Sequence, residues 1–223
     1  MEDNKNKEIQ SIIDNSQKSN TSNTSNKSNK TEREKMLSGE LYFANGEELF
    51  TLRDNSSKLC KEFNKLDHFE TEKKEEIMTK LLGSVGKNCF ITPPIQMDYG
   101  INTHLEDGVY MNFGCVILDC ARIDIGEGTL FAPNVQLYAA THPTDPETRK
   151  SGLELAFPIK IGKNCWIGGG AIILPGVTIG DNTTIGAGSV VTKNIPANVV
   201  AVGNPCRVIK SVGKTQEGDV IDK

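Results

Sequence analysis

The sequence predicts a mainly β protein, a parallel β-helix with a small α-helical region in front of it. From residue 161 to 196, large apolar residues return at every sixth position, a period that neither an α-helix nor a plain strand has. A glycine or an asparagine stands three residues after each of them, whereas apolar residues between 31 and 83 have helical spacing. One strand and one turn per six residues close into a prism, in which each strand pairs with the strand above.

The repeat has three recognisable positions. Its large apolar position holds Ile161, Ile167, Ile173, Ile179, Ile185 and Val191. Its turn position holds the residue types that best tolerate a left-handed backbone, namely Asn164, Gly170, Gly176, Asn182, Gly188 and Asn194. The fifth position of each unit is mostly small, and Cys89, Cys115 and Cys165 fall on it, which makes them core filler. The same phase continues backwards through Leu137, Phe131 and Ile125, and a two-residue insertion near Asp124 separates it from a second phase.

The region before the repeat divides at residue 31. Residues 1–30 are almost wholly polar, with the run SNTSNTSNKSNK, and we expect a disordered tail. Thr31 and Glu34 fit a capping box that opens a helix, and two or three helices should precede residue 84. We therefore expect a helical region over 31–83, the β-helix over 84–210 and a C-terminal tail over 211–223.

The repeats fail over residues 143–157, PTDPETRKSGLELAF, because two prolines and mixed charges cannot continue a coil. This segment is interpreted as an excursion loop that leaves the prism. It begins directly after His142, and a loop on a rigid scaffold is a common place for chemistry.

Composition excludes several classes of function. The formal charge is −4 and no basic block is long enough to follow a phosphate backbone, so we expect no nucleic-acid partner. No apolar run reaches a membrane-spanning length and no secretory signal is recognisable, which predicts no membrane association and a cytoplasmic location. The six cysteines are scattered and should stay reduced. The three histidines are far apart in sequence, so no local zinc motif is present and no metal is expected.

Residues 33–210 resemble the maltose and galactoside O-acetyltransferases of the hexapeptide-repeat acyltransferase family. The resemblance is carried by REKMLSGELYFANGEELFTLR, DYGINTHLEDGVYMNFGCVILD, ATHP at 140–143, the repeat from Lys160 to Pro196, and VGNPCRVIK at the end. It implies a left-handed parallel β-helix, acetyl-CoA as cosubstrate and transfer of acetyl to a hydroxyl of a small molecule, a sugar above all. It also implies a homotrimer with each active site between neighbouring prisms.

Acetyl transfer from a thioester to a hydroxyl needs a base for the hydroxyl proton and a donor for the oxyanion. His142 is the candidate base, because an imidazole is often neutral at physiological pH and because the family motif matches there. Glu154 either orients the imidazole or meets the acceptor, and a solvated surface charge is the alternative. A backbone N–H near Gly169 is the oxyanion candidate that the resemblance implies.

The resemblance also implies the binding residues. Acceptor contacts fall on Asp98, Asn112 and Asp119, with Tyr110 and Arg53 lining the same pocket. Galactoside members carry an acid soon after the Leu-Tyr or Leu-Phe of the first helix, whereas Ala44 and Asn45 stand here, which leaves the sugar preference open. Coenzyme A should lie along the prism and contact Trp166, Gly169, Ala187, Thr192, Lys193, Arg207 and Lys210. Lys193 and Lys210 are equally compatible with solvated surface, and Trp166 with a structural role.

Three other interpretations compete. A zinc enzyme of the γ-type carbonic anhydrase kind needs three converging histidines, and His68 falls in the helical region instead. A β-helix that only binds or scaffolds would keep the groove without the base, and His142 argues against it. Acceptors other than sugars stay open within the acetyltransferases.

Overall fold

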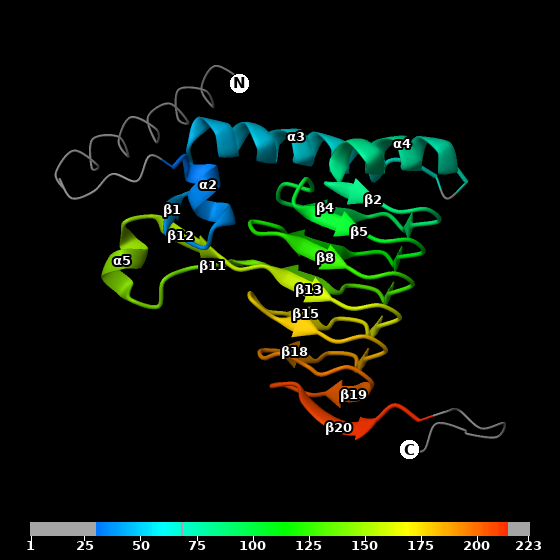
Figure 1. Cartoon of the computed structure of the whole chain (residues 1–223). Helices are drawn as coiled ribbons and strands as arrows, with labels where there is room; N and C mark the ends of the chain where they lie inside the picture. The colour runs from blue at the N-terminus through cyan, green and yellow to red at the C-terminus, as the bar shows by residue number, and fades with distance from the viewer. Residues whose placement is uncertain (1–29, 68, 214–223) are drawn as a thin grey trace.

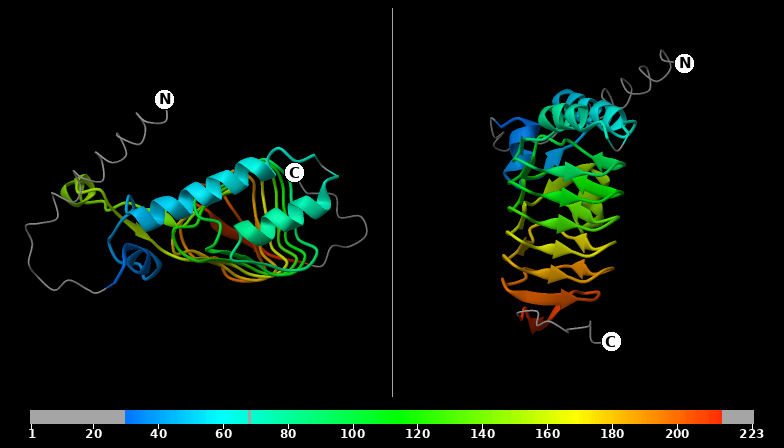
Figure 2. Two further views of the ribbon diagram at one scale, coloured as in Figure 1. Left: turned by 90° about the horizontal axis from the view of Figure 1, so that it is seen from above. Right: turned by 90° about the vertical axis from the view of Figure 1, so that its right-hand side faces the viewer.

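The computed structural model describes residues 30–67 and 69–213. Its main body is a prism of stacked coils, a left-handed parallel β-helix of about six turns, as predicted (Figure 1). Two helices lie across one end of the prism, and the last described residues lie at the other end (Figure 2). The predicted tail up to residue 29, His68 and residues 214–223 lie outside the described residues.

Each wall of the prism is one sheet of stacked short strands. The β7 sheet, in the order β18-β15-β10-β7-β4, consists of β4 (Ile95–Met97), β7 (Cys115–Leu118), β10 (Gln136–Tyr138), β15 (Ile172–Ile173) and β18 (Val190–Val191). The β8 sheet consists of β2 (Ser84–Val85), β5 (Thr103–Leu105), β8 (Ile123–Ile125), β13 (Ile159–Ile161) and β16 (Thr178–Ile179). The β9 sheet consists of β3 (Phe90–Ile91), β6 (Tyr110–Met111), β9 (Leu130–Phe131), β14 (Trp166–Ile167), β17 (Thr184–Ile185), β19 (Val199–Val202) and β20 (Arg207–Ser211). All pairings in these walls are parallel except β19 with β20, which is antiparallel.

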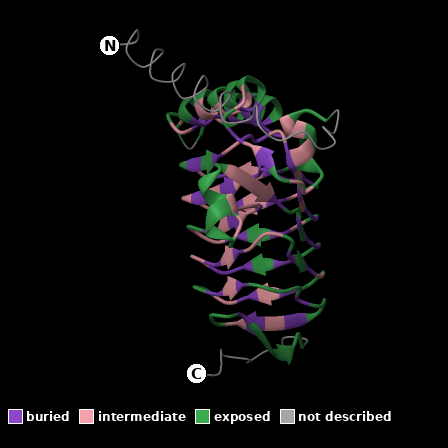
Figure 3. Ribbon diagram, turned by 90° about the vertical axis from the view of Figure 1, so that its left-hand side faces the viewer, coloured by how far each residue is buried: buried purple, intermediate pink, exposed green. Residues whose placement is uncertain are grey.

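The six-residue period fills the prism interior. The large apolar residue of successive repeats points inward from each wall in turn, and all six from Ile161 to Val191 are buried. Buried and exposed residues therefore alternate along the coils (Figure 3). All six cysteines lie within the described residues and are buried free thiols, and Cys89, Cys115 and Cys165 fill the core.

The predicted turn positions have a left-handed backbone with one exception. Asn164, Asn182 and the glycines of the repeat have positive φ, but Asn194 does not. The prediction for Asn194 is wrong because its side chain is used differently: Asn194 Oδ1 accepts a hydrogen bond of 2.8 Å from the Thr178 N–H. The left-handed residue of this last coil is Asn198, with φ of 61°.

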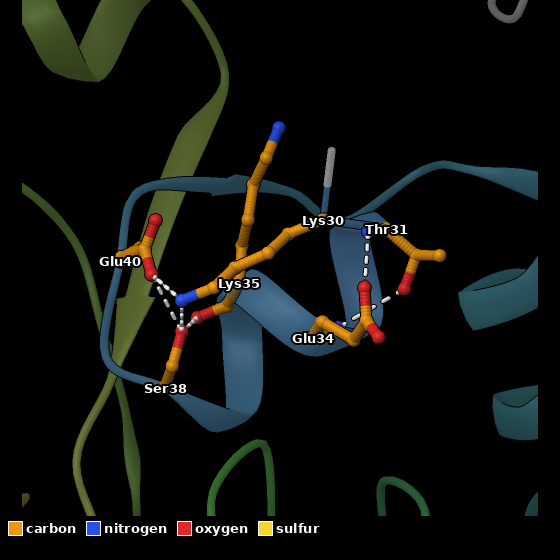
Figure 4. Close-up of polar contacts among 6 residues, drawn as sticks. All are labelled: Lys30, Thr31, Glu34, Lys35, Ser38 and Glu40. Atoms are coloured by element: carbon orange, nitrogen blue, oxygen red, sulfur yellow. Dashed lines mark hydrogen bonds and ion pairs between the residues drawn. The ribbon is translucent and has the colours of Figure 1, made fainter. Parts of the chain in front are cut away.

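Three helices precede the prism within the described residues, in agreement with the helical spacing of the sequence. They are α2 (Glu32–Leu37), α3 (Glu47–Phe63) and α4 (Thr71–Leu81). The capping box is present at the start of α2, where the Thr31 hydroxyl accepts from the Glu34 N–H and the Glu34 carboxylate accepts from the Thr31 N–H (Figure 4). Lys30 bonds with Ser38 and Glu40 beyond the other end of this short helix (Figure 4). Across the described ranges, no helix has the length and apolar character needed to cross a membrane.

The excursion after His142 is more ordered than a simple loop. It contains the short helix α5 (Pro146–Lys150) and strand β12 (Leu153–Ala156), which turns back against β11 (Ala140–Thr141). On its other side β12 pairs with β1 (Tyr42–Phe43) from the N-terminal region. This three-stranded antiparallel sheet, β1-β12-β11, joins the excursion to the helical region beside the prism (Figure 1).

Candidate active site

The β1-β12-β11 sheet aligns three polar side chains in one row. Tyr42 of β1 lies directly opposite Glu154 of β12. On the other side, Ala140 pairs with Ala156 and Thr141 with Leu155, so the same register places the next residue, His142, opposite Glu154. Directly opposed residues of an antiparallel pair point to the same face, with Cβ atoms about 4.5–5.5 Å apart. The fold thus brings together the two residues predicted to be catalytic.

Tyr42 is the buried member of this row. Its side chain is fully buried, and its hydroxyl donates a hydrogen bond of 2.9 Å to Glu154 Oε2. Burial raises the pKa of Tyr42 well above its ordinary value, and the neighbouring Cys120 and Glu154 raise it further. Tyr42 is therefore a neutral hydrogen-bond donor throughout the pH range in which a protein works.

Asp98 and Cys120 continue the polar cluster behind Tyr42. Cys120 Sγ lies 3.4 Å from Asp98 Oδ2. Burial raises the pKa of Asp98, while the Cys120 thiol and the Arg53 guanidinium oppose that rise. Burial likewise raises the pKa of Cys120, with the charge of Asp98 as the second cause, so the thiol stays protonated. Asp98 thus lies in the cluster that contains Glu154, as an acceptor-binding residue beside His142 requires.

Arg53 reaches the same region from α3. Its guanidinium donates hydrogen bonds of 2.7 Å to the Tyr99 hydroxyl and to the Ala44 carbonyl, and it lies 5.7 Å from the centre of the Tyr99 ring. These contacts fix a positive charge near Asp98, whose pKa it lowers. The half-buried Arg53, which is predicted to line the acceptor pocket, thus has two of its donors already engaged.

Asp119 has a structural position that the family motif does not reveal. It is fully buried, and its carboxylate accepts hydrogen bonds from the N–H groups of Tyr99, Gly100 and Asn102 and from the Thr103 hydroxyl, at 2.8 to 3.2 Å. Burial raises the pKa of Asp119 and these donors oppose the rise. The carboxylate is buried and anchors the turn that follows Asp98 through these four donors, and its contact with an acceptor stays a prediction.

The remaining candidates lie at two opposite edges of the β7 sheet. The carboxyl edge, where its strands end, holds Asp98, His142, Thr192 and Lys193. The amino edge, where its strands begin, holds Asn112, Gly169 and Ala187, with Tyr110 and Trp166 on the adjoining β9 sheet. Strand β7 alone, four residues long, separates the edges by roughly 13 Å at about 3.3 Å per residue. One chain therefore does not bring Asn112 or Gly169 to His142.

The candidates for coenzyme A are mostly exposed. Trp166, the only tryptophan, is 56% exposed on the outer face of β14. Ala187, Thr192, Lys193, Arg207 and Lys210 are also exposed, and the last two lie on the terminal strand β20. The Gly169 N–H donates to no group of the described chain, and a Cβ at Gly169 would lie 3.2 Å from the Pro133 carbonyl oxygen. Gly169 thus leaves a free donor on a surface where a side chain would be crowded.

The other described histidine is engaged elsewhere. His104 lies on the outer face of the β8 sheet, with Nδ1 3.0 Å from the Ser84 hydroxyl and Nε2 3.1 Å from Arg122 Nη1. Burial and then the charge of Arg122 lower its pKa. Among residues 30–67 and 69–213, no three histidine, cysteine or acidic side chains are grouped as metal ligands.

Sequence reasoning missed Tyr42 and Cys120 as members of the site. Tyr42 stands in the quoted segment REKMLSGELYFANGEELFTLR, and Cys120 is the residue directly after the segment that ends in ILD. The bond between Tyr42 and Glu154 joins residues 112 positions apart, so no local pattern could show it.

Comparison with known proteins matches both parts of the chain. The family described as the maltose acetyltransferase hexapeptide capping motif matches residues 35–86, and the bacterial transferase hexapeptide family, with six repeats, matches residues 158–193. A galactoside O-acetyltransferase of Escherichia coli is 44% identical over 179 residues, which are 80% of this chain and 88% of that protein.

Solved structures agree in both sequence and shape. The crystal structure of a maltose O-acetyltransferase from Clostridium difficile 630 is 52% identical, with a TM-score of 0.82, covering 84% of this chain and all of that one. A galactoside acetyltransferase in complex with coenzyme A is 44% identical, with a TM-score of 0.80, covering 83% of this chain and 92% of that one. The similarity therefore includes the capping helices, the excursion and the prism.

Proposed function

Because the chain belongs to the maltose and galactoside O-acetyltransferase family and is an acetyltransferase, we propose that it moves acetyl from acetyl-CoA to a sugar hydroxyl, with His142 as the general base. The observation that carries this proposal is the placement of the exposed His142 beside Glu154 at an edge of the prism. The coenzyme A bound in a related galactoside acetyltransferase supports the choice of donor.

The reaction follows from the chemistry of the groups at hand. His142 takes the proton of the acceptor hydroxyl as its oxygen attacks the thioester carbonyl carbon. The tetrahedral intermediate carries its negative charge on the former carbonyl oxygen, for which the free Gly169 N–H is the donor. The carbon–sulfur bond then breaks, and the imidazolium returns its proton to the departing thiolate. His142 thereby returns to its starting protonation state, and the products are the acetylated acceptor and free coenzyme A.

A complete site requires a second prism. His142 and Asp98 lie at the carboxyl edge, whereas Asn112 and Gly169 lie at the amino edge, on the other side of the β7 sheet. Two chains packed side by side, with the carboxyl edge of one against the amino edge of the next, would close one groove. A closed ring of such contacts gives the homotrimer that we propose, with one site at each interface.

The surfaces flanking this groove suit coenzyme A. Trp166 offers an exposed aromatic face to the apolar pantetheine arm, and Arg207 and Lys210 offer positive charge to the phosphates. The Asp98 carboxylate and the Asn112 amide suit sugar hydroxyls, since they combine acceptors with donors. Galactoside members carry an acid where Ala44 and Asn45 stand in this chain, so Glu154 is an acidic side chain available at the acceptor side.

An acceptor screen tests this function. The protein is incubated with acetyl-CoA and maltose, glucose, galactosides, serine or a hydroxyl-bearing antibiotic, and free thiol release is followed. We expect release above background with one of the sugars and a mass increase of one acetyl group on that sugar. Release only with a non-sugar would overturn the sugar assignment, and coenzyme A binding without turnover on any acceptor would indicate a binding module.

A further inference from the structure

Tyr42 contacts Glu154, one of the two residues predicted to be catalytic, from the buried side of the β1-β12-β11 sheet. We propose that Tyr42 is a positioning residue that holds the Glu154 carboxylate against His142, an inference that rests on the proposed role of His142. The Tyr42 hydroxyl bonds Glu154 Oε2 at 2.9 Å, whereas Glu154 Oε1 accepts no hydrogen bond from the described chain. One carboxylate oxygen is thereby fixed and the other is left for the imidazole.

The sheet supplies the geometry for this contact. Glu154 is in the central strand β12, with Tyr42 opposite it on β1, and His142 is the residue that follows β11, where the register of β11 and β12 continues to Glu154. A carboxylate in this position can accept a hydrogen bond from one imidazole nitrogen and leave the other nitrogen free to take a proton. That is the role of the acid in a Ser-His-Asp triad, where it fixes the tautomer and stabilises the imidazolium.

The chemical nature of the donor matters to this role. A lysine or arginine bonded to Glu154 would cancel the charge that stabilises an imidazolium, whereas the neutral Tyr42 hydroxyl orients the carboxylate and leaves its charge. The other groups facing Tyr42 and Glu154 are Cys120, which is protonated, and Asp98, which is like-charged. The nearby cation, Arg53, is bonded to Tyr99 and the Ala44 carbonyl instead.

A purely structural role for Tyr42 makes different predictions. In that case the hydroxyl only fastens the excursion to the cap, and its loss lowers stability without a specific kinetic effect. Thr129 provides the control, because its hydroxyl is also buried and hydrogen-bonded: it donates to the Gly162 carbonyl at 2.8 Å and accepts from the Cys165 N–H at 3.0 Å, in a different part of the prism. Thr129→Val should lower the melting temperature and leave the pH–rate profile unchanged.

The test compares the pH–rate profiles of Tyr42→Phe, Glu154→Gln, the double variant and Thr129→Val with the best acceptor. We expect Tyr42→Phe to lower kcat about 3- to 10-fold, the effect of one lost neutral hydrogen bond. Glu154→Gln should lower kcat further, because the carboxylate charge that would stabilise the imidazolium formed during transfer is gone. The double variant should match Glu154→Gln, since Tyr42 acts through Glu154.

Two results would overturn the inference. One is a folded Tyr42→Phe protein with the kcat and profile of Thr129→Val, and the other is a double variant whose losses simply multiply. His142→Ala separates this failure from that of the proposed function. If His142→Ala is inactive while Tyr42→Phe is normal, only the positioning role is wrong, whereas an active His142→Ala removes both.

Discussion

The side-chain amide of Asn64 makes two hydrogen bonds with the backbone of Ile95, one from its Nδ2 to the carbonyl oxygen and one to its Oδ1 from the N–H, each 2.8 Å long. Asn64 ends α3 and Ile95 begins β4, so this pair fastens the helical cap to the first strand of the β7 sheet. The acceptor-side residues Arg53 and Asp98 lie on the same two segments. The position of the candidate pocket thus depends on this joint.

Asn64→Ala should lower the free energy of unfolding by about 1–3 kcal/mol, because two backbone groups lose their partner. Chemical denaturation measures the loss. Asn55→Ala, at an exposed position of the same helix, is the control and should change stability by less than about 0.5 kcal/mol. Equal effects of the two substitutions would show that the joint does not hold the cap.

Asp98 gives a prediction on pH. Burial raises its pKa above the unfolded value, so its contribution to stability is present at low pH and is lost as the pH rises and the buried carboxyl must ionise. Asp98→Asn removes that cost. Chemical denaturation between pH 4 and 8 measures the free energy of unfolding of both proteins. The variant should gain stability relative to the native chain as the pH rises, and the two free energies should converge near pH 4. A constant difference would contradict the assigned cause. The same variant should lose acceptor turnover.

We predict a homotrimer, because the candidate site residues are divided between the carboxyl edge and the amino edge of the β7 sheet. Sedimentation should find a trimer, and mixing His142→Ala chains with Asn112→Ala chains should restore part of the activity, because some interfaces then combine two intact edges. Each variant alone should be nearly inactive. A fully active monomer, or mixing without any recovery, would contradict a site shared between chains.

The sequence could predict those parts of the fold that depend on residues close together in the chain, such as a repeat period or a helix cap. The six-residue repeat indicates the stacked coils, and the Thr31–Glu34 pair indicates the start of α2. The Asn194 turn was predicted wrongly, because an asparagine side chain can bond a neighbouring coil instead of entering a left-handed turn. The order within the excursion also escaped prediction, since β12 pairs both with β11 and with β1, and β1 lies more than one hundred residues away in the sequence.

The site shows the same limit. His142 and Glu154 could be proposed from the sequence, because a motif and a break in the repeat mark their positions. Asp119 belongs to the family motif, but only the structure shows that its carboxylate accepts hydrogen bonds from four donors. Tyr42 has no local mark, because its role depends on a partner brought to it by the antiparallel sheet.

The central claim is that His142 removes the proton of the acceptor hydroxyl, and the turnover of a folded His142→Ala protein tests it most directly. An acceptor hydroxyl is too weakly acidic to attack a thioester unless its proton leaves as the bond forms. Loss of the base should therefore lower kcat about 10²- to 10⁴-fold, roughly 3 to 5 kcal/mol of barrier. His142→Asn should be equally inactive, because an amide makes a hydrogen bond but takes no proton.

The measurement is kcat with the best acceptor, together with sedimentation and calorimetric binding of coenzyme A to the same preparation. The account predicts loss of turnover with the trimer and the affinity for coenzyme A unchanged. A folded, assembled His142→Ala protein that keeps most of its turnover would contradict it.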